Sequence, residues 1–460
     1  MLSQGKMRIL LIAPPCIYSG EYHNYMPPLG LLSIATCVRQ QEIEVKVIDC
    51  KDPETTEAIE KIVDDYEPTI VGLSVMTTNY PEAVKISQLL KRKGIKIVYG
   101  GPHPSADWKG PLMRNYADVC VTGPGEDAFM RVIKGEDLDG IPGVAYKRGN
   151  ELRYYPHIKS VNISLLPTPE RTFLNLREYF TYIDSPVHGK VEANTLYTSM
   201  GCVHNCIYCI ARNTCNWTRR LPEQVCDEIG YLNDINPKEG LFFCDLTFTV
   251  DKKWIYQFCG QMVKRGLNRY KWYVMGNVDL VDEGLLESMA EAGCIQVSYG
   301  FEVLDDRILR NIGKKQTVKE IERVVKMTSN AGLCPMAHFI VGLPGQTRET
   351  LFRELEVIKE WIVQYHFYPG DFYPMMIFPG TEIFRRGAHK YGGHDWLSEI
   401  SGNFVFKNIP VYEEEMALDE LLEISDYMNM ECRRILKENT KIYNKTVKSR
   451  KSHGTSENES

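Results

Sequence analysis

Three cysteines lie close together near the middle of this 460-residue chain, in the stretch Ser199-Met-Gly-Cys-Val-His-Asn-Cys-Ile-Tyr-Cys209. Their spacing, Cys202-x3-Cys206-x2-Cys209, places three thiols on one short loop. Three thiolates with such spacing can ligate three irons of a 4Fe–4S cluster and leave the fourth iron open for another ligand. We therefore predict a metal centre at these three cysteines and expect the catalytic chemistry there.

A zinc knuckle completed by Cys215 or His204, or a chance cluster, is the alternative interpretation of this loop. Structural zinc sites usually combine two pairs of Cys or His ligands separated by a longer loop. The sequence has no second pair, which favours the iron–sulfur interpretation. Of the 14 cysteines, those outside the loop are scattered singly, as expected for small apolar residues in a reducing compartment.

Strand and helix patterns alternate on both sides of the cysteine loop. From residue 7 to about 135, short apolar runs followed by helical spacing predict a parallel sheet with helices on both faces. From about 191 to 385, six more strand candidates, the first at Leu196–Ser199, predict six β/α units. The fold class is therefore α/β: a Rossmann-like (flavodoxin-like) domain followed by a partial (β/α)6 TIM barrel and a small C-terminal helical region. Ligands are expected beyond the carboxyl ends of the strands in both domains.

Gly- and Pro-rich turns and changes in composition mark the boundaries of further segments. Gly140-Ile-Pro-Gly143 and Leu166-Pro-Thr-Pro169 interrupt the alternation and predict a connector with a small hairpin. Residues 416–438 have the pattern of one amphipathic helix, and the Lys/Ser/Asn/Glu-rich end of the chain is typical of disorder. The expected segments are the N-terminal domain at 1–140, the connector at 141–190, the barrel at 191–385, the helical region at 386–440 and a disordered tail at 441–460.

Composition excludes several classes of protein. Hydrophobic residues make up 43% and charged residues 25%, which is ordinary for a globular protein. The net charge of −6 argues against a general nucleic-acid partner, which usually requires a basic surface. No apolar run reaches the roughly 18 residues of a membrane span, and the N-terminus lacks the layout of a signal peptide. We therefore expect a cytoplasmic protein with no membrane span.

The cysteine loop resembles that of radical S-adenosylmethionine (radical SAM) enzymes. That family carries the same spacing after the first strand of a partial barrel, with an aromatic residue before the third cysteine, and Tyr208 matches. Later segments are similar to its strand ends in the same order: Phe243–Thr249, Ser298–Glu302, Phe339–Gly345 and Tyr373–Thr381. The resemblance implies that SAM binds the open iron and is cleaved to methionine and a 5′-deoxyadenosyl radical. It implies SAM contacts at Tyr208, Asp245, Glu302 and Gly342.

Glycine-rich loops follow the fourth and fifth strands of the N-terminal domain and, with Ser74 after the third, share one sheet edge. From the residues alone, these loops suit a flavin, a nucleotide or ordinary tight turns. The landmarks Pro14-Pro15, Pro27–Gly30, Val71–Ser74 and Gly100–Pro104 resemble the cobalamin-binding domain fused to one branch of radical SAM enzymes. That resemblance implies cobalamin contacts at Ser74, Met76, Gly100, Gly101, His103, Gly123, Gly125 and Glu126.

One motif of many cobalamin proteins, Asp-x-His-x-x-Gly with its axial histidine, is absent from the sequence. The resemblance therefore implies cobalamin bound without that ligand. Met76 is the candidate for the lower face of the cobalt, and core packing is the alternative role for a methionine at this position.

The combined resemblance implies a cobalamin-dependent radical SAM C-methyltransferase. Such an enzyme methylates an unactivated carbon of a peptide or protein side chain, or of a small molecule, through methylcobalamin and a 5′-deoxyadenosyl radical. A cobalamin-binding radical SAM enzyme that oxidises, rearranges or cyclises its substrate is the alternative. The glutamine C-methyltransferase acting on methyl-coenzyme M reductase is a candidate relative within the methylating class.

The cofactors implied are a 4Fe–4S cluster, SAM and cobalamin, and the implied partner is a reductant such as ferredoxin or flavodoxin. Substrate contacts are harder to place from the sequence. The candidates lie near predicted strand ends and are Arg212, Asn277 and His338.

Overall fold

The structure, a computed structural model, describes residues 7–15, 25–51, 53–387 and 416–453. For residues 53–57, 212–213, 387 and 440–453 it describes the backbone alone. The chain divides into two compact units that are not continuous in sequence. The first comprises residues 1–180, 198–224 and 377–410, and the second comprises 181–197, 225–376 and 411–460. Each unit is described by itself.

The first unit is built on a seven-stranded sheet with the order β2-β1-β3-β4-β5-β6-β7. Strands β1 to β5 are parallel, whereas β6 and β7 form an antiparallel hairpin that continues the sheet. The expected hairpin therefore belongs to this sheet. The strands are β1 (Arg8–Ala13), β2 (Glu44–Asp49), β3 (Ile70–Ser74), β4 (Lys96–Gly100), β5 (Val119–Val121), β6 (Val144–Arg148) and β7 (Glu151–Tyr154).

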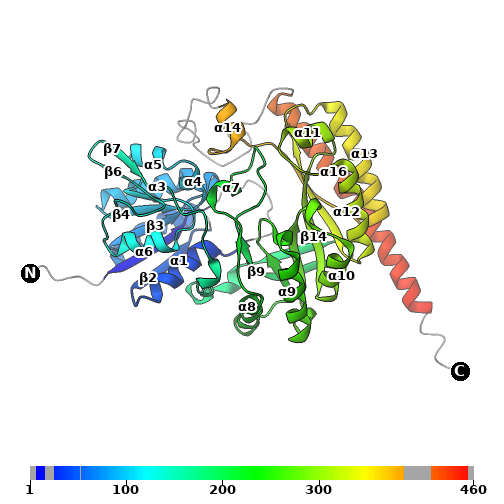
Figure 1. The fold of residues 1–460 in the computed structure, drawn as a ribbon, viewed down its shortest axis with the longest axis horizontal. Helices are drawn as coiled ribbons and strands as arrows, with labels where there is room; N and C mark the ends of the chain where they lie inside the picture. The colour runs from blue at the N-terminus through cyan, green and yellow to red at the C-terminus, as the bar shows by residue number, and fades with distance from the viewer. Residues whose placement is uncertain (1–6, 16–24, 52, 388–415, 454–460) are drawn as a thin grey trace, which may run out of the picture. The chain divides into compact units, whose positions relative to one another are not determined.

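Helices connect the parallel strands of this sheet, as the alternation predicts (Figure 1). An apolar core forms where Leu32 and Val132 of two helices pack with strand residues such as Ile9, Leu11 and Val98. Burial of these aliphatic side chains fixes which face each helix turns to the sheet. The helices are α1 (Leu29–Arg39), α2 (Pro53–Tyr66), α3 (Tyr80–Arg92), α4 (Pro102–Ala106), α5 (Lys109–Met113) and α6 (Glu126–Ile133).

The second unit is built on another seven-stranded sheet, with the order β16-β15-β14-β13-β12-β9-β8. Six of these strands are parallel, and β8 pairs antiparallel with β9 at one edge. The predicted partial (β/α)6 barrel is confirmed. The strands are β8 (Thr181–Ser185), β9 (Gly189–Leu196), β12 (Gly240–Phe243), β13 (Lys271–Gly276), β14 (Cys294–Glu302), β15 (Cys334–Val341) and β16 (Tyr368–Pro374).

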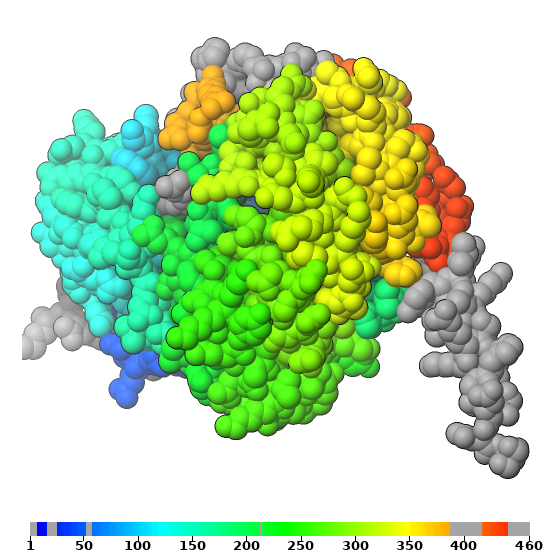
Figure 2. Space-filling view, turned by 45° about the vertical axis from the view of Figure 1, so that its right-hand side comes forward, coloured from blue at the N-terminus to red at the C-terminus, as the bar shows by residue number. Residues whose placement is uncertain are grey.

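Aromatic side chains pack the helices onto the outer face of this sheet. Phe339 of β15 stacks on Phe372 of β16 with ring centroids 5.0 Å apart, and Phe301 lies edge-on to Trp361 of the helix α13. Helices α13 and α16 lie side by side on the surface (Figure 2). The helices are α8 (Pro222–Ile235), α9 (Lys252–Lys264), α10 (Glu283–Glu291), α11 (Asp306–Asn311), α12 (Val318–Asn330), α13 (Arg348–Tyr365) and α16 (Leu418–His453).

Two expectations about element bounds were wrong. The first barrel strand ends at Leu196 instead of beginning there, because residues 189–193 pair with β8 as a hairpin. The C-terminal helix, expected over 416–438, runs from Leu418 to His453 and enters the segment expected to be a disordered tail. No Gly or Pro interrupts the sequence between Leu418 and Gly454, so nothing in it breaks the helix before that glycine. Among the described residues, no helix is both long and apolar enough to cross a bilayer.

The loop after β4 packs so closely at Gly101 that a side chain at this position should destabilise the protein. Its backbone has φ +103° and ψ −170°, a region essentially open to glycine alone, and a Cβ there would lie 2.9 Å from the Val75 carbonyl oxygen. We expect Gly101→Ala to lower the free energy of unfolding by about 1–3 kcal/mol, measured by urea denaturation. Gly100→Ala is the matched control, because its Cβ would meet no heavy atom within 4 Å. Equal denaturation midpoints for the two variants would contradict this account.

Candidate functional site

The cysteine loop begins at a short two-stranded ribbon in the first unit. β10 (Ser199–Met200) pairs antiparallel with β11 (Thr218–Arg219). Gly201 follows with φ +81°, and a Cβ on it would lie 2.7 Å from the Asn216 carbonyl oxygen. Only glycine permits this close approach, so the chain turns sharply immediately before Cys202.

Other segments of the first unit hold the far side of the loop. Ile207 is 8% exposed, and its carbonyl oxygen accepts a 3.1 Å hydrogen bond from the Ile383 N–H of α14 (Glu382–Gly387). A Cβ on Gly380 would lie 3.0 Å from Ala106 of α4 and 3.5 Å from Ile210. The loop therefore lies between α14 and α4, with α7 (Ala211–Thr214) directly after it.

The chemistry of the loop thiols fits an iron–sulfur cluster. No disulfide involves Cys202, Cys206 or Cys209, the first two are half-buried and the third is exposed. The Ala211 N–H donates a 3.4 Å hydrogen bond to Cys209 Sγ, a contact that stabilises a thiolate sulfur. Cys215 differs, because burial raises the pKa of its thiol and so disfavours a ligating thiolate. Among the described residues, no three His, Cys, Asp or Glu side chains form a preassembled site for a single metal ion.

The loops predicted to hold cobalamin gather at the carboxyl edge of the first sheet. Ser105 Oγ donates to the Gly101 carbonyl oxygen at 2.9 Å and accepts from the Gly123 N–H at 2.9 Å, which joins the loops after β4 and β5. After β3, Asn79 Oδ1 accepts from the Met76 N–H at 2.7 Å. Met76 is 40% exposed, so it is not a core residue and remains available to contact a ligand at this edge.

Two of the predicted cobalamin residues are engaged within the protein. His103 is fully buried, with Nδ1 3.1 Å from Thr77 Oγ1 and its ring 4.2 Å from that of Tyr80. Glu126 Oε1 accepts a 2.8 Å hydrogen bond from Ser33 Oγ on α1. We infer that these two side chains hold the loops in place. Ser74, Gly100, Gly123 and Gly125 lie at the same edge, as the strand ends require.

His157 is a residue of this edge that the sequence analysis missed. Its Nδ1 lies 3.3 Å from Thr122 Oγ1, and a Cβ on Gly123 would lie only 2.5 Å from its Cδ2 atom. Gly123 therefore leaves room for the imidazole. The histidine follows the β6–β7 hairpin, and only the pairing of that hairpin with β5 brings it to the loop.

In the second unit, Glu302 lies at the carboxyl end of β14 in an unusual conformation. Its φ is +67°, and the register between β14 and β15 shifts at Gly300/Glu302. Such a bulge re-aims a side chain, and a left-handed conformation is costly for a residue other than glycine. Lys314 stabilises it: its Nζ lies 2.9 Å from Glu302 Oε1 and donates to the Gly300 carbonyl oxygen at 2.9 Å. Gln316 Nε2 donates to that oxygen as well, at 3.0 Å.

Gly342 and Asp245, the other SAM candidates of this unit, lie after the carboxyl ends of β15 and β12 of the same sheet. Gly342 has φ +88°, and a Cβ there would lie 3.0 Å from Leu421 of α16. Gln346, which the sequence analysis missed, holds the turn: it accepts from the Leu343 N–H at 2.8 Å and donates to the Ile340 carbonyl oxygen at 3.1 Å. Asp245 is fully buried after β12. Tyr208, the fourth candidate, is half-buried on the cysteine loop of the first unit.

The candidate substrate residues have different surroundings. Asn277 Nδ2 donates to Thr247 Oγ1 at 3.1 Å, so it connects the loops after β13 and β12. Burial lowers the pKa of the His338 imidazole, while Glu302 and Asp371 act in the opposite direction. The side chain of Arg212 lies outside the described residues.

Two protein-family models match the chain. Residues 15–133 match the B12 binding domain model, and residues 196–358 match the radical SAM superfamily model. The chain belongs to the cobalamin-dependent radical SAM proteins. The strand order, the cysteine loop and the loops at both carboxyl edges agree with that membership.

Three similar proteins illustrate the range of this group. An uncharacterized methyltransferase of Pyrococcus horikoshii is 28% identical over 82% of each chain. The anaerobic magnesium-protoporphyrin IX monomethyl ester cyclase of Cereibacter sphaeroides is 25% identical over 77% of this chain and 60% of its own length. The solved structure of the methyltransferase TsrM from Kitasatospora setae has 20% identity and a TM-score of 0.68, covering 84% of this chain and 77% of TsrM. At 20% identity, the similarity to TsrM supports a shared fold alone.

Glu354 of α13 supports the segment after Glu302 and provides a test by pH. Its Oε2 accepts a 3.0 Å hydrogen bond from the Leu304 N–H, and burial raises its pKa from 4.5 to about 8. The unfolded chain therefore loses this proton first, so the free energy of unfolding falls as pH rises from about 4.5 to about 8. Glu354→Gln keeps the acceptor for Leu304 but does not titrate.

We expect the stability of Glu354→Gln relative to the wild type to increase across this pH range and to level off above about pH 8. Urea denaturation of both proteins at several pH values measures the difference. A difference that stays constant with pH would show that Glu354 is already ionised in the folded protein.

Proposed function

We propose that this protein is a cobalamin-dependent radical SAM C-methyltransferase. The observation that carries the proposal is the three-thiol loop, Cys202 to Cys209, in a chain that also has a B12-binding domain. Three protein thiols complete only three corners of a 4Fe–4S cluster, and the B12-binding domain supplies a cobalamin site. The Pyrococcus horikoshii relative, named as a methyltransferase, supports methyl transfer as the reaction class.

When bound, the cluster would supply the electron that cleaves SAM, and cobalamin would carry the methyl group. The residues of the chain would bind these cofactors and orient them. Cys202, Cys206 and Cys209 would hold the cluster, and the Ala211 N–H would stabilise one of its thiolates. The carboxyl-edge loops joined by Ser105 would hold the corrin ring, with the exposed face of Met76 against it.

In the second unit, Glu302 would accept hydrogen bonds from SAM, and Asp245 and Gly342 would contribute further contacts to it. The substrate would present an unactivated carbon on a peptide or protein side chain, or on a small molecule. His338, whose pKa is lowered by burial, would stay neutral near neutral pH and could exchange hydrogen bonds with such a substrate. Asn277 would contact it through the loop it shares with Thr247.

A non-methylating cyclisation or oxidation is the second candidate function. The similarity to the Cereibacter sphaeroides cyclase favours it. Both reactions consume SAM at a cluster, so the protein residues discussed above serve either one. The products derived from SAM distinguish them.

The test is a single-turnover product assay on anaerobically reconstituted protein with cobalamin, SAM and dithionite. We expect both 5′-deoxyadenosine and S-adenosylhomocysteine, quantified by mass spectrometry. Cys206→Ala should abolish 5′-deoxyadenosine, whereas the matched Cys226→Ala, a buried cysteine of α8, should retain it. Deoxyadenosine without S-adenosylhomocysteine would favour the non-methylating function, and neither product would contradict both.

The Glu302 site can be tested without turnover, through the affinity for SAM. A Cβ on Gly300 would lie 2.5 Å from Glu302 Oε1 and 2.8 Å from Lys314 Nζ. These atoms are the ends of flexible side chains, so Gly300→Ala should displace the carboxylate and leave the fold intact. We expect SAM binding to weaken about tenfold, as for the loss of one hydrogen bond to a charged group, with an unchanged melting temperature.

The control for this prediction is Gly260→Ala on α9, where a Cβ would meet no heavy atom within 4 Å. Lys314→Gln adds a double-mutant cycle. If Lys314 acts through Glu302, it should weaken SAM binding in the wild type and have little effect when combined with Glu302→Gln. Additive losses would show that Lys314 does not act through Glu302. Wild-type affinity in Gly300→Ala would exclude Glu302 as the SAM ligand.

A further inference from the structure

Large apolar side chains are exposed along two strips of the first unit, residues 158–165 and 216–224. Leu165 is 81% exposed, the highest value among the described large apolar side chains, while Ile158 is 60% and Leu221 is 52% exposed. Contiguous exposed apolar side chains of this size commonly mark a binding surface. We call the exposed residues Ile158, Lys159, Leu165 and Leu221, together with the partly exposed Arg219, the connector surface.

Hydrogen bonds show that the two strips run beside each other. The Asn216 N–H donates to the Lys159 carbonyl oxygen at 2.8 Å, and Asn216 Nδ2 donates to Ser160 Oγ at 3.0 Å. Further along, Gln224 Nε2 donates to the Ser164 carbonyl oxygen at 2.8 Å, and its Oε1 accepts from the Leu221 N–H at 2.9 Å. The two strips that carry the exposed apolar residues are therefore adjacent along their length.

The same strips are joined to the cysteine loop. β11 lies within the second strip and pairs with β10, which leads to the loop. The Asn216 carbonyl oxygen lies 2.7 Å from the Cβ position of Gly201, the residue before Cys202. A protein docked on the connector surface would thus be separated from the predicted cluster by little more than the backbone of this ribbon.

Charge indicates what kind of partner this surface fits. The two strips contain three basic residues and one acidic residue, Lys159, Arg219, Arg220 and Glu223, in a chain whose net charge is −6. Arg220 is buried, Lys159 and Glu223 are exposed and Arg219 is partly exposed, so the accessible groups of the strips are two basic and one acidic. An acidic protein approaching this chain would be repelled by its overall charge and attracted by this local patch.

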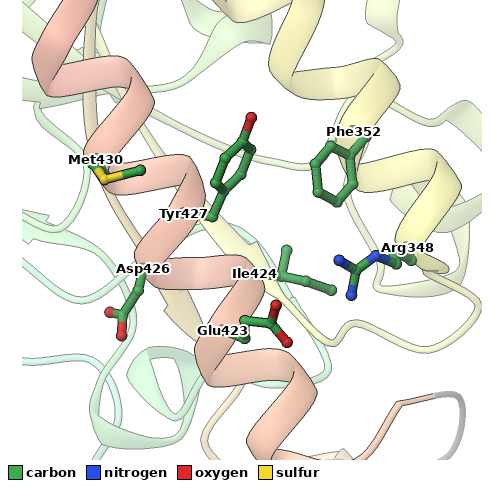
Figure 3. Close-up of a pocket in the computed structure, with 7 residues that line it drawn as sticks. All are labelled: Arg348, Phe352, Glu423, Ile424, Asp426, Tyr427 and Met430. Carbon is green, nitrogen blue, oxygen red and sulfur yellow. The ribbon is translucent and has the colours of Figure 1, made fainter.

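A second exposed apolar surface has the opposite charge. The groove between α13 and α16 is lined by Phe352, Tyr427 and Met430 and bordered by Glu423 and Asp426 (Figure 3). Residues 418–430 of α16 contain four acidic and no basic residues. The Arg348 guanidinium at this groove lies 3.6 Å from Glu420. This groove would repel an acidic partner.

We propose that the connector surface docks a small acidic one-electron carrier protein, which reduces the cluster held by the cysteine loop. This inference rests on the proposed function, because it assumes a cluster that must be reduced. One electron passes from the carrier to the cluster: the carrier is oxidised by one electron and the cluster goes from its 2+ to its 1+ state. The apolar side chains supply the contact and the basic residues supply orientation and association rate.

The experiment compares a protein donor with a chemical donor on the same reconstituted, full-length protein. The probes are flavodoxin hydroquinone, an acidic carrier, and dithionite, which needs no docking surface. Cluster reduction is followed by stopped-flow absorbance, and the affinity for oxidised flavodoxin is measured by calorimetry at low ionic strength. The variants are Leu165→Glu and Lys159→Glu, both at exposed positions, with Met430→Glu in the α13–α16 groove as the matched control.

We expect both connector variants to lower the flavodoxin reduction rate about tenfold and to weaken flavodoxin binding, while dithionite reduces them at the wild-type rate. Met430→Glu should behave as wild type, and added salt should slow flavodoxin and not dithionite. Wild-type flavodoxin rates in the connector variants, an effect of Met430→Glu instead, or equal losses with both donors would overturn the proposal. Absence of a reducible cluster in the unchanged protein would refute the proposed function itself.

Discussion

Parallel strands bring all their carboxyl ends to one edge of a sheet, and both units of this chain depend on that constraint. In the first unit, it gathers the loops after β3, β4 and β5, which are far apart in sequence. In the second unit, it gathers Asp245, Glu302 and Gly342 at the carboxyl ends of the parallel strands β12, β14 and β15. The loops can vary in chemistry because the strands below them, buried on both faces, supply the stability.

The loops at these edges keep demanding backbone conformations because neighbouring groups stabilise them. Glu302 has a left-handed conformation, and Lys314, Gln316 and Glu354 all bond to its carboxylate or to the backbone on either side of it. Gly101 is held against Val75 in the same way in the first unit. A bulge or a left-handed residue that is fixed by several bonds aims a side chain at a defined place, which a cofactor site requires.

Sequence patterns predicted the architecture well because it depends on local periodicity. Apolar runs such as Ile70–Ser74 and helical spacing as in Val318–Asn330 follow from burial on one or both faces. The predictions failed where pairing or length depends on distant residues. The prediction assigns Gly189 and Lys190 to the connector, whereas both pair with β8. The Lys-rich segment predicted to be a disordered tail continues as helix α16.

In the candidate site too, residues recognisable from the local sequence were predicted, and residues that act through distant partners were not. The cysteines and glycines could be found because their spacing or their conformation is visible in the sequence. Lys314, Gln346, Glu354 and His157 could not, since each acts through a partner brought near by the fold. The burial of His103 was likewise hidden, because a histidine in a glycine-rich loop suggests a ligand contact whichever way its ring turns.

The central claim is that three thiols hold a cluster whose fourth iron is open to SAM. Electron paramagnetic resonance of the reduced, reconstituted protein with and without SAM tests it most directly. The account predicts a spin-1/2 4Fe–4S signal that SAM shifts and that is lost in Cys202→Ala. A cluster signal unchanged by SAM, or zinc bound in place of iron, would contradict it.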